Sequence, residues 1–90
     1  MSNKVITTLL ARDRKFYIIH FKGYYCAIED KYLDENMCLT QQLNGLQMHA
    51  MKELPECIES VQDVVEIDYL MSLGMSFEDA FNQRFRVSAK

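Results

Sequence analysis

The side chains best suited to chemistry in this 90-residue sequence are three cysteines and two histidines, which are common zinc ligands. In chain order they are His20, Cys26, Cys38, His49 and Cys57. Neighbours in this series are separated by 6, 12, 11 and 8 positions, and the short C-x-x-C or H-x-x-x-H pairs of structural zinc sites are missing. We therefore expect no metal, no other cofactor and three reduced thiols that behave as small apolar side chains.

The sequence also lacks the motifs that are typical of enzymes. Phosphate-handling enzymes use a glycine-rich loop, and this chain has three scattered glycines. Serine, cysteine, histidine and acidic residues are present, but they form no recognisable catalytic motif. We predict that the protein is not an enzyme and has no catalytic residues.

Acidic residues give the clearest remaining signal. Residues 53–79 contain eight acids and no lysine or arginine, whereas the other five acids are mixed with bases. In a helix, three of these acids share one flank with two apolar residues beside them, and this flank is either a solvated face or a contact surface for a basic partner. Apolar anchors beside charges are typical of interfaces, which adds some support to the second interpretation and leaves the first open. The predicted contact residues are Glu59, Asp63, Glu66, Ile67 and Leu70.

Asp68 does not belong to that flank, because helical periodicity places it among apolar residues with Ser72 one turn away. Three interpretations are open. Asp68 pairs with a base or a backbone N–H at the edge of the core, or it is a buried carboxylate with a raised pKa and a chemical role. In the third, the helix bends and exposes it.

The elements that position these residues begin with a β-meander. Residues 4–12, 15–21 and 24–29 are rich in β-branched and aromatic side chains, and Asp13-Arg14 and Lys22-Gly23 are the predicted turns. Two-residue turns would pair Leu10 with Tyr17 and Phe21 with Tyr24, and paired residues share a face. The predicted core face carries Ile6, Thr8, Leu10, Tyr17, Ile19, Phe21, Tyr24, Cys26 and Ile28. The other face would expose an apolar patch for a homodimer, made of Leu9, Phe16, Ile18 and Tyr25.

Helical signals dominate the second half of the chain. Residues 46–51 alternate well enough for a fourth strand. Pro55 then suits the first position of a helix, and Gly74 suits the position just after its end. Ser76 is a typical cap for a short second helix over residues 77–86.

These elements predict a single α+β domain spanning residues 1–90. It has an N-terminal antiparallel β-meander of three to four strands, followed by two helices packed on one face of the sheet. The net charge of −3 and the single short basic cluster argue against direct nucleic-acid binding. No apolar stretch is long enough to span a bilayer and no signal peptide is recognisable, so we expect a cytoplasmic protein without membrane contact.

Protein–protein interaction is the function that these exclusions leave. In size and charge the sequence is similar to small inhibitors encoded by phages and mobile elements, such as anti-CRISPR proteins. That resemblance implies a non-enzymatic inhibitor of a host nucleic-acid-handling machine, bound through the acidic helix face to a larger protein with a basic surface. One alternative is a nucleotide-type ligand bound at a dimer seam lined by Tyr24, Tyr25 and His20. Another is a regulatory subunit of a larger assembly.

Overall fold

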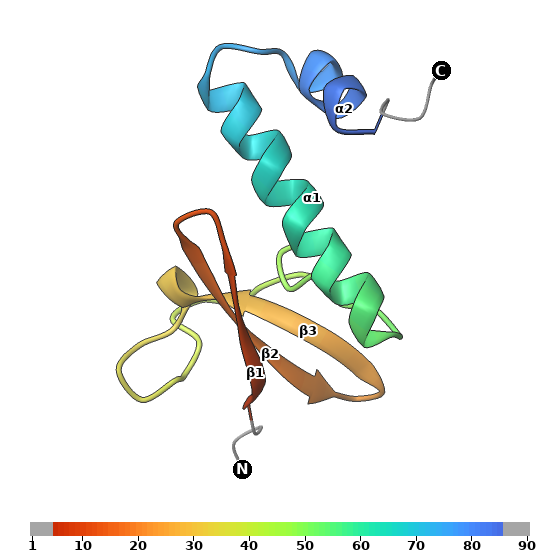
Figure 1. Cartoon of the computed structure of the whole chain (residues 1–90). Coiled ribbons are helices and arrows are strands. Elements are labelled where there is room, and N and C mark those ends of the chain that lie inside the picture. Colours follow the sequence, from red (N-terminus) through yellow and green to blue (C-terminus); the bar gives the residue numbers. More distant parts are fainter. Residues whose placement is uncertain (1–4, 86–90) are drawn as a thin grey trace.

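The computed structural model describes residues 5–85 as a three-stranded antiparallel sheet followed by two helices (Figure 1). The elements are β1 (Val5–Ala11), β2 (Arg14–Phe21), β3 (Tyr24–Glu29), α1 (Leu54–Ser72) and α2 (Phe77–Phe85). This order confirms the predicted α+β class. Lys4 and Arg86, the outer ends of the predicted first strand and second helix, lie outside the described residues.

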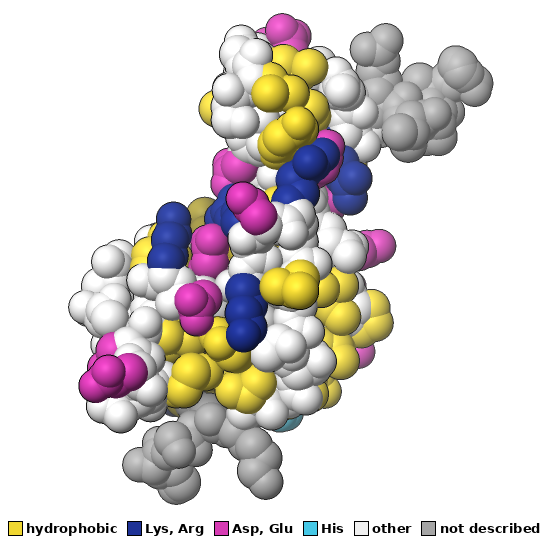
Figure 2. Space-filling view, turned by 60° about the vertical axis from the view of Figure 1, so that its left-hand side comes forward, with side chains coloured by type: hydrophobic (Ala, Val, Ile, Leu, Met, Phe, Trp, Pro, Cys, Tyr) yellow, Lys and Arg dark blue, Asp and Glu magenta, His cyan; other side chains and the backbone are white. Residues whose placement is uncertain are grey.

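The two helices occupy different places in the fold. Helix α1 crosses one face of the sheet and continues beyond it, and α2 packs against the part of α1 that extends past the sheet (Figure 1). The molecule therefore has a larger lobe, built on the sheet, and a smaller lobe made of α2 and the end of α1 (Figure 2). The structure contains no described helix with the length and apolar character needed to cross a bilayer.

The hairpin between β2 and β3 has the predicted register. Lys22 and Gly23 form its turn with φ angles of 53° and 83°, which lie in the left-handed region that such tight turns require. Phe21 is paired with Tyr24 across this turn. The dipeptide therefore fixes both the position of the turn and the pairing of the strands.

The hairpin between β1 and β2 turns one residue earlier than predicted. Arg12 and Asp13 form the turn, with Arg12 at a φ of 56°, and Ala11 is paired with Arg14. Leu10 consequently faces Lys15 and not Tyr17. From Thr7 to Ala11 the pairing is shifted by two residues, so these side chains keep their predicted companions on a face, because side chains alternate with a period of two. A β-bulge between Val5 and Thr7 breaks this register and pairs Val5 with Ile19.

The choice of core face was wrong. Helix α1 covers the face that carries Phe16 and Ile18, which are 1% and 0% exposed, and Leu9 and Tyr25 are partly buried beside them. These four residues therefore form no exposed patch and cannot serve the predicted homodimer. Both faces of the sheet are apolar, so alternation alone does not choose between them. The main core consists of Phe16, Ile18, Ala27, Cys57, Val61 and Val65.

The opposite face of the sheet is only partly covered. Leu10 is 71% exposed and Ile6 is 47% exposed, although both were expected in the core. Cys26 and Ile28 lie on the same face and are buried as predicted, and Met48 and Met51 are hydrogen-bonded along the edge of β3 beside them. The open part of this face thus belongs mainly to β1 and to the adjoining half of β2.

The segment between β3 and α1 contains no fourth strand over residues 46–51. A short 3-10 helix, Asp30–Tyr32, is followed by the predicted turn, in which the Asp34 carboxylate accepts the Asn36 N–H at 2.8 Å. Residues 45–49 then coil into consecutive turns, and His49 takes a φ of 51° that a strand cannot contain. Within residues 46–51, Met51 alone forms a β-bridge, to Tyr25, and covers part of the open edge of β3, while a separate bridge pairs Leu33 with Leu39.

The ends of the helices follow their local signals. Gly74 has a φ of 107° and donates its N–H to the Met71 carbonyl, while Met75 donates to the Leu70 carbonyl. These two bonds form a Schellman motif, which ends α1 where glycine was expected to end it. The Ser76 hydroxyl accepts the Asp79 N–H at 3.1 Å and caps α2 as predicted.

Candidate functional site

The cysteines are separated by burial. Cys26 and Cys57 are buried and Cys38 is exposed, and all three are free thiols. Burial raises the pKa of the Cys57 thiol to about 11, so this side chain is an inert apolar group at neutral pH. Among residues 5–85, no three histidine, cysteine or acidic side chains gather in a geometry that could hold a metal ion.

The residues predicted to line a ligand pocket do not come together. His20 and Tyr25 stack with ring centres 4.6 Å apart, and they are paired across β2 and β3. Tyr24 is the next residue along β3, so its side chain points to the other face of the sheet. The pair forms a packed aromatic contact rather than the wall of a pocket.

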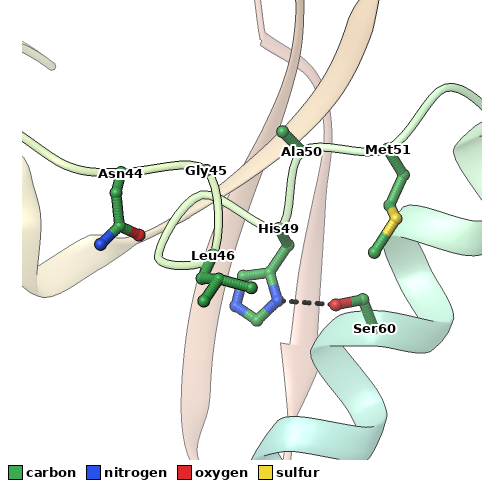
Figure 3. A pocket seen from close by; sticks show the side chains of 7 residues that line it. All are labelled: Asn44, Gly45, Leu46, His49, Ala50, Met51 and Ser60. Carbon is green, nitrogen blue, oxygen red and sulfur yellow. Dashed lines mark hydrogen bonds between the residues drawn. The ribbon is translucent and has the colours of Figure 1, made fainter.

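The second histidine lines an open hollow of about 510 Å³ between the coiled segment and α1 (Figure 3). His49 is 7% exposed, and its Nδ1 lies 3.0 Å from the Ser60 hydroxyl. Burial lowers the pKa of His49, so the imidazole is neutral at physiological pH. Among the described residues no carboxylate is hydrogen-bonded to His49, so the pair lacks the third group that orients a catalytic histidine.

The turn between β1 and β2 is held against α1 by arginines. Arg14 donates to both carboxylate oxygens of Glu29, at 2.9 and 2.7 Å, and to Asp68 at 2.9 Å. The Arg14 guanidinium holds the pKa of Glu29 below its ordinary value. Asp68 therefore pairs with a nearby base, and its side chain is 54% exposed, which excludes the interpretation as a buried carboxylate.

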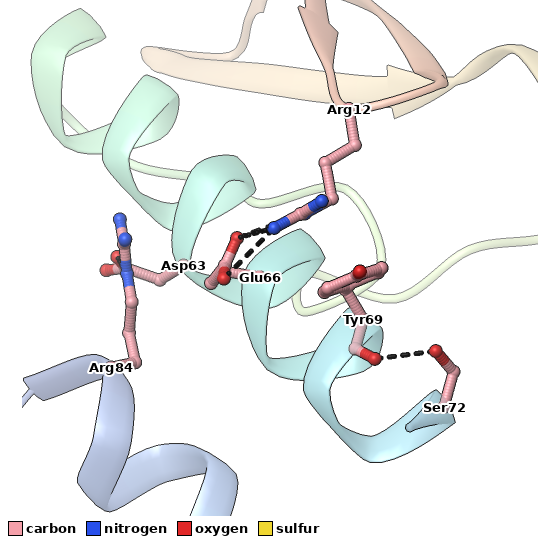
Figure 4. Close-up of polar contacts among 6 residues, drawn as sticks. All are labelled: Arg12, Asp63, Glu66, Tyr69, Ser72 and Arg84. Atoms are coloured by element: carbon pink, nitrogen blue, oxygen red, sulfur yellow. Dashed lines mark hydrogen bonds and ion pairs between the residues drawn. The ribbon is translucent and has the colours of Figure 1, made fainter.

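Arg12 makes the neighbouring contact with α1 (Figure 4). It donates two hydrogen bonds to the Glu66 carboxylate, at 3.1 and 3.3 Å, and its guanidinium carbon lies 3.6 Å from the centre of the Tyr69 ring. The ring face attracts this cation, so Tyr69 supports the ion pair. Ser72, one turn further, donates its hydroxyl to the Tyr69 carbonyl and takes no part in either ion pair.

The acidic flank is consequently not free of bases. Arg84 of α2 donates to the Asp63 carboxylate at 2.9 Å (Figure 4), so two of the three predicted contact acids, Asp63 and Glu66, are paired within the chain. Of the three predicted acids, Glu59 alone has no cationic partner among the described residues. The prediction overlooked these pairs because the bases lie 21 and 54 positions away in the sequence.

The predicted apolar anchors are buried inside the smaller lobe. Ile67 and Leu70 are 7% and 6% exposed and pack with Ala80 and Met75, because α2 folds back across that side of α1. They cannot contact a partner directly. The short turn around Gly74 could have indicated this arrangement, since closely connected helices usually pack as antiparallel neighbours.

An open groove of about 490 Å³ runs between α1 and α2. One wall is a row of phenylalanines on α2, and the opposite wall is the exposed acidic side of α1. Phe77, Phe81 and Phe85 are 58%, 44% and 45% exposed, and successive ring centres lie 5.8 and 4.6 Å apart. The remaining lining residues are Met51, Glu56, Glu59, Ser60, Asp63, Val64 and Ile67.

This groove combines the features of a contact surface. Hydrophobic side chains gather on the smaller lobe and reach solvent there (Figure 2), although a solvated helix would normally keep its aromatic rings covered. Phe77, Phe81 and Phe85 supply apolar contact area, and Glu56 and Glu59 supply negative charge along one side. The arrangement can hold an apolar segment that carries positive charge.

Comparison with known proteins found no family model, no curated protein and no solved structure that matches the chain.

Proposed function

We propose that this protein is a small non-enzymatic protein-binding domain that holds a basic partner in the groove between α1 and α2. The observation that carries the proposal is the exposed aromatic row of Phe77, Phe81 and Phe85. These rings contact one another but are left about half exposed, whereas Phe16 in the sheet core is 1% exposed. An apolar row of this kind on a small domain usually marks a binding surface.

The charge of the partner follows from the side of the groove opposite the rings. Glu56 and Glu59 line it and have no cationic partner within the described residues. They replace Asp63 and Glu66 as the acids that are free to attract a partner. A basic surface on the larger protein would therefore be steered toward this side of the domain.

A finer form of the proposal concerns the partner's role. The small size and the net charge of −3 suit an inhibitor that occupies a basic site on a nucleic-acid-handling machine, as expected for an anti-CRISPR-like protein. The pairing of Asp63 with Arg84 and of Glu66 with Arg12 reduces the free negative charge on α1. We therefore assign the main part of the binding energy to the phenylalanine row and a steering role to the acids.

Affinity capture with the tagged full chain tests this proposal. Phe81→Ala removes the central ring of the row, and Glu56→Lys with Glu59→Lys reverses the free acids. The control is Glu35→Lys with Glu78→Lys, which changes the net charge equally at two exposed positions that do not line the groove. Far-ultraviolet circular dichroism of each variant checks that it is folded.

We expect both groove variants to lose a basic partner by about tenfold, which corresponds to 1.4 kcal/mol, while the control retains it. The same captured machine should lose activity when the wild-type domain is added, which tests the inhibitor role. Equal capture by the wild type and both groove variants would show that the groove is not the binding site.

The hollow at His49 supports a second candidate, the binding of a small polar ligand. Its neutral imidazole and the Ser60 hydroxyl are the polar groups that such a ligand could reach. In a thermal-shift screen, a nucleotide that binds in this hollow should raise the melting temperature of the wild type but not of His49→Gln. A flat screen with the wild-type protein would reject this candidate.

A further inference from the structure

We infer that the occupant of the groove between α1 and α2 is an amphipathic helix with basic flanks, which packs there as a third helix. This inference rests on the proposed function and specifies its partner. It is carried by three properties of the groove: the kind of backbone that lines it, the length of its aromatic row, and the charge along one side.

The backbone of the groove offers few hydrogen bonds to a partner. Apart from Met51 and the residues at helix ends, Glu56, Phe77 and Phe85, the lining residues lie inside α1 and α2, where N–H and C=O groups are engaged along the helices. An extended peptide would gain no strand partner here, and its buried backbone groups would stay unsatisfied. A helix satisfies its own backbone and presents only side chains, so it is the form of chain that fits.

The aromatic row matches the spacing of a helical partner. Phe77 and Phe85 are eight positions apart in α2, which corresponds to about 12 Å along its axis. Apolar side chains at positions i, i+4 and i+7 of a partner helix span about 10 Å, so three anchors could lie along the three rings. Val64 of α1, which is 39% exposed, provides apolar surface on the other side of these anchors.

The charge along the groove selects a basic helix. Glu56 and Glu59 are close enough along α1 to form one acidic edge, and Asp63 continues it although Arg84 already pairs with that carboxylate. Lysine or arginine on the flank of the partner would meet this edge. The first turn of α2 carries Glu78 and Asp79, so docking of a second copy of α2 would bring like charges together.

Binding of a designed peptide to the full chain tests this inference. The peptide is a helix of about five turns with leucine along one stripe and lysine elsewhere, and it carries one tryptophan. The protein contains no tryptophan, so the fluorescence of the peptide reports binding directly. One comparison peptide has glutamate in place of lysine, and another has two prolines in its centre that break the helix.

We expect the lysine peptide to bind at least about tenfold more tightly than the glutamate and proline peptides. Its affinity should fall about tenfold for Glu56→Lys with Glu59→Lys and for Phe81→Ala, but not for Glu35→Lys with Glu78→Lys. Equal binding of the glutamate peptide would overturn the basic occupant, and equal binding of the proline peptide would overturn the helix. Sedimentation of the wild type as a dimer, with Phe81→Ala monomeric, would assign the groove to a second copy.

The two levels of inference can fail separately. If capture of a basic partner depends on Phe81 and Glu59 but the lysine peptide does not bind, the groove is the binding site and the occupant is not a simple helix. If neither capture nor peptide binding responds to the groove variants, the proposed function and the helical occupant are both rejected.

Discussion

Helix α1 buries its two halves in very different surroundings. The first half places Cys57, Val61 and Val65 against the sheet, and these residues are 0–3% exposed. The second half extends beyond the sheet and buries Ile67 and Leu70 against one short helix, with Ala80 as the buried residue of α2. One continuous helix thus joins a dense core to a thin one.

This difference separates the part of the molecule that secures the fold from the part that offers a surface. The sheet side leaves little apolar area open along α1. The α2 side leaves a row of phenylalanines about half exposed, because nine residues of helix cannot cover both α1 and their own aromatic side chains. The short helix α2 therefore accounts for both the thin core and the open groove.

The largest expected effect on stability comes from replacing a phenylalanine by alanine in the sheet core, and the same replacement in α2 provides the comparison. Phe16→Ala should lower the free energy of unfolding by about 3–5 kcal/mol, because it empties a fully packed site. Phe77→Ala should lower it by about 1 kcal/mol or less, because that ring is 58% exposed. Urea denaturation measures both, and similar losses would contradict the division into a dense and a thin core.

Leu70→Ala should have the next largest effect, about 2 kcal/mol, and it should act locally. Loss of this side chain weakens the contact with Ala80, so α2 should detach while the sheet stays folded. Native-state hydrogen exchange would show protection lost in α2 and retained in β2. Leu73→Ala, at a position that is 62% exposed, is the control and should leave both regions protected.

Arg14→Gln should lower stability by about 1–2 kcal/mol at pH 7, because it leaves the Glu29 carboxylate without its charged donor. The folded-state pKa of Glu29 lies below its unfolded value of about 4.3, so its contribution is present above that pH and is lost as the pH falls through the folded pKa. The free energy of unfolding of the wild type should therefore fall as the pH is lowered from neutral through the folded-state pKa of Glu29. Urea titrations at successive pH values should show that the free energy of unfolding of Arg14→Gln falls less steeply with decreasing pH than that of the wild type.

Charge reversal at Glu59 should have the smallest effect on folding, within about 0.5 kcal/mol, because this exposed side chain has no cationic partner in the described part of the chain. The same change should weaken partner binding. A melting temperature that falls as far as for Leu70→Ala would mean that the acidic edge supports the fold rather than a partner.

Local signals in the sequence predicted the elements well. Lys22-Gly23, Gly74 and Ser76 act through the backbone of their own few residues, so their effects could be inferred without knowing the fold. The three strands, the two helices and their order followed from such signals and from periodicity.

Long-range choices could not be inferred in the same way. Both faces of the sheet are apolar, so nothing local indicated that α1 would cover Phe16 and Ile18 rather than Leu10. The neutralisation of Asp63 and Glu66 depends on arginines that only the folded chain brings near. The groove was missed for the same reason, since Phe77, Phe81 and Phe85 resemble a core stripe until the path of α2 is known.

The attachment of the β1–β2 turn to α1 also has a consequence for folding kinetics. Arg12 and Arg14 each contact an acid 54 positions further along the chain. Contacts that close so long a loop form only after the entropy of the intervening segment has been lost, so they are expected late, after the transition state. Loss of these two long-range contacts should then speed unfolding and leave the folding rate nearly unchanged. On this view, the two ion pairs set the lifetime of the native state rather than the time needed to reach it.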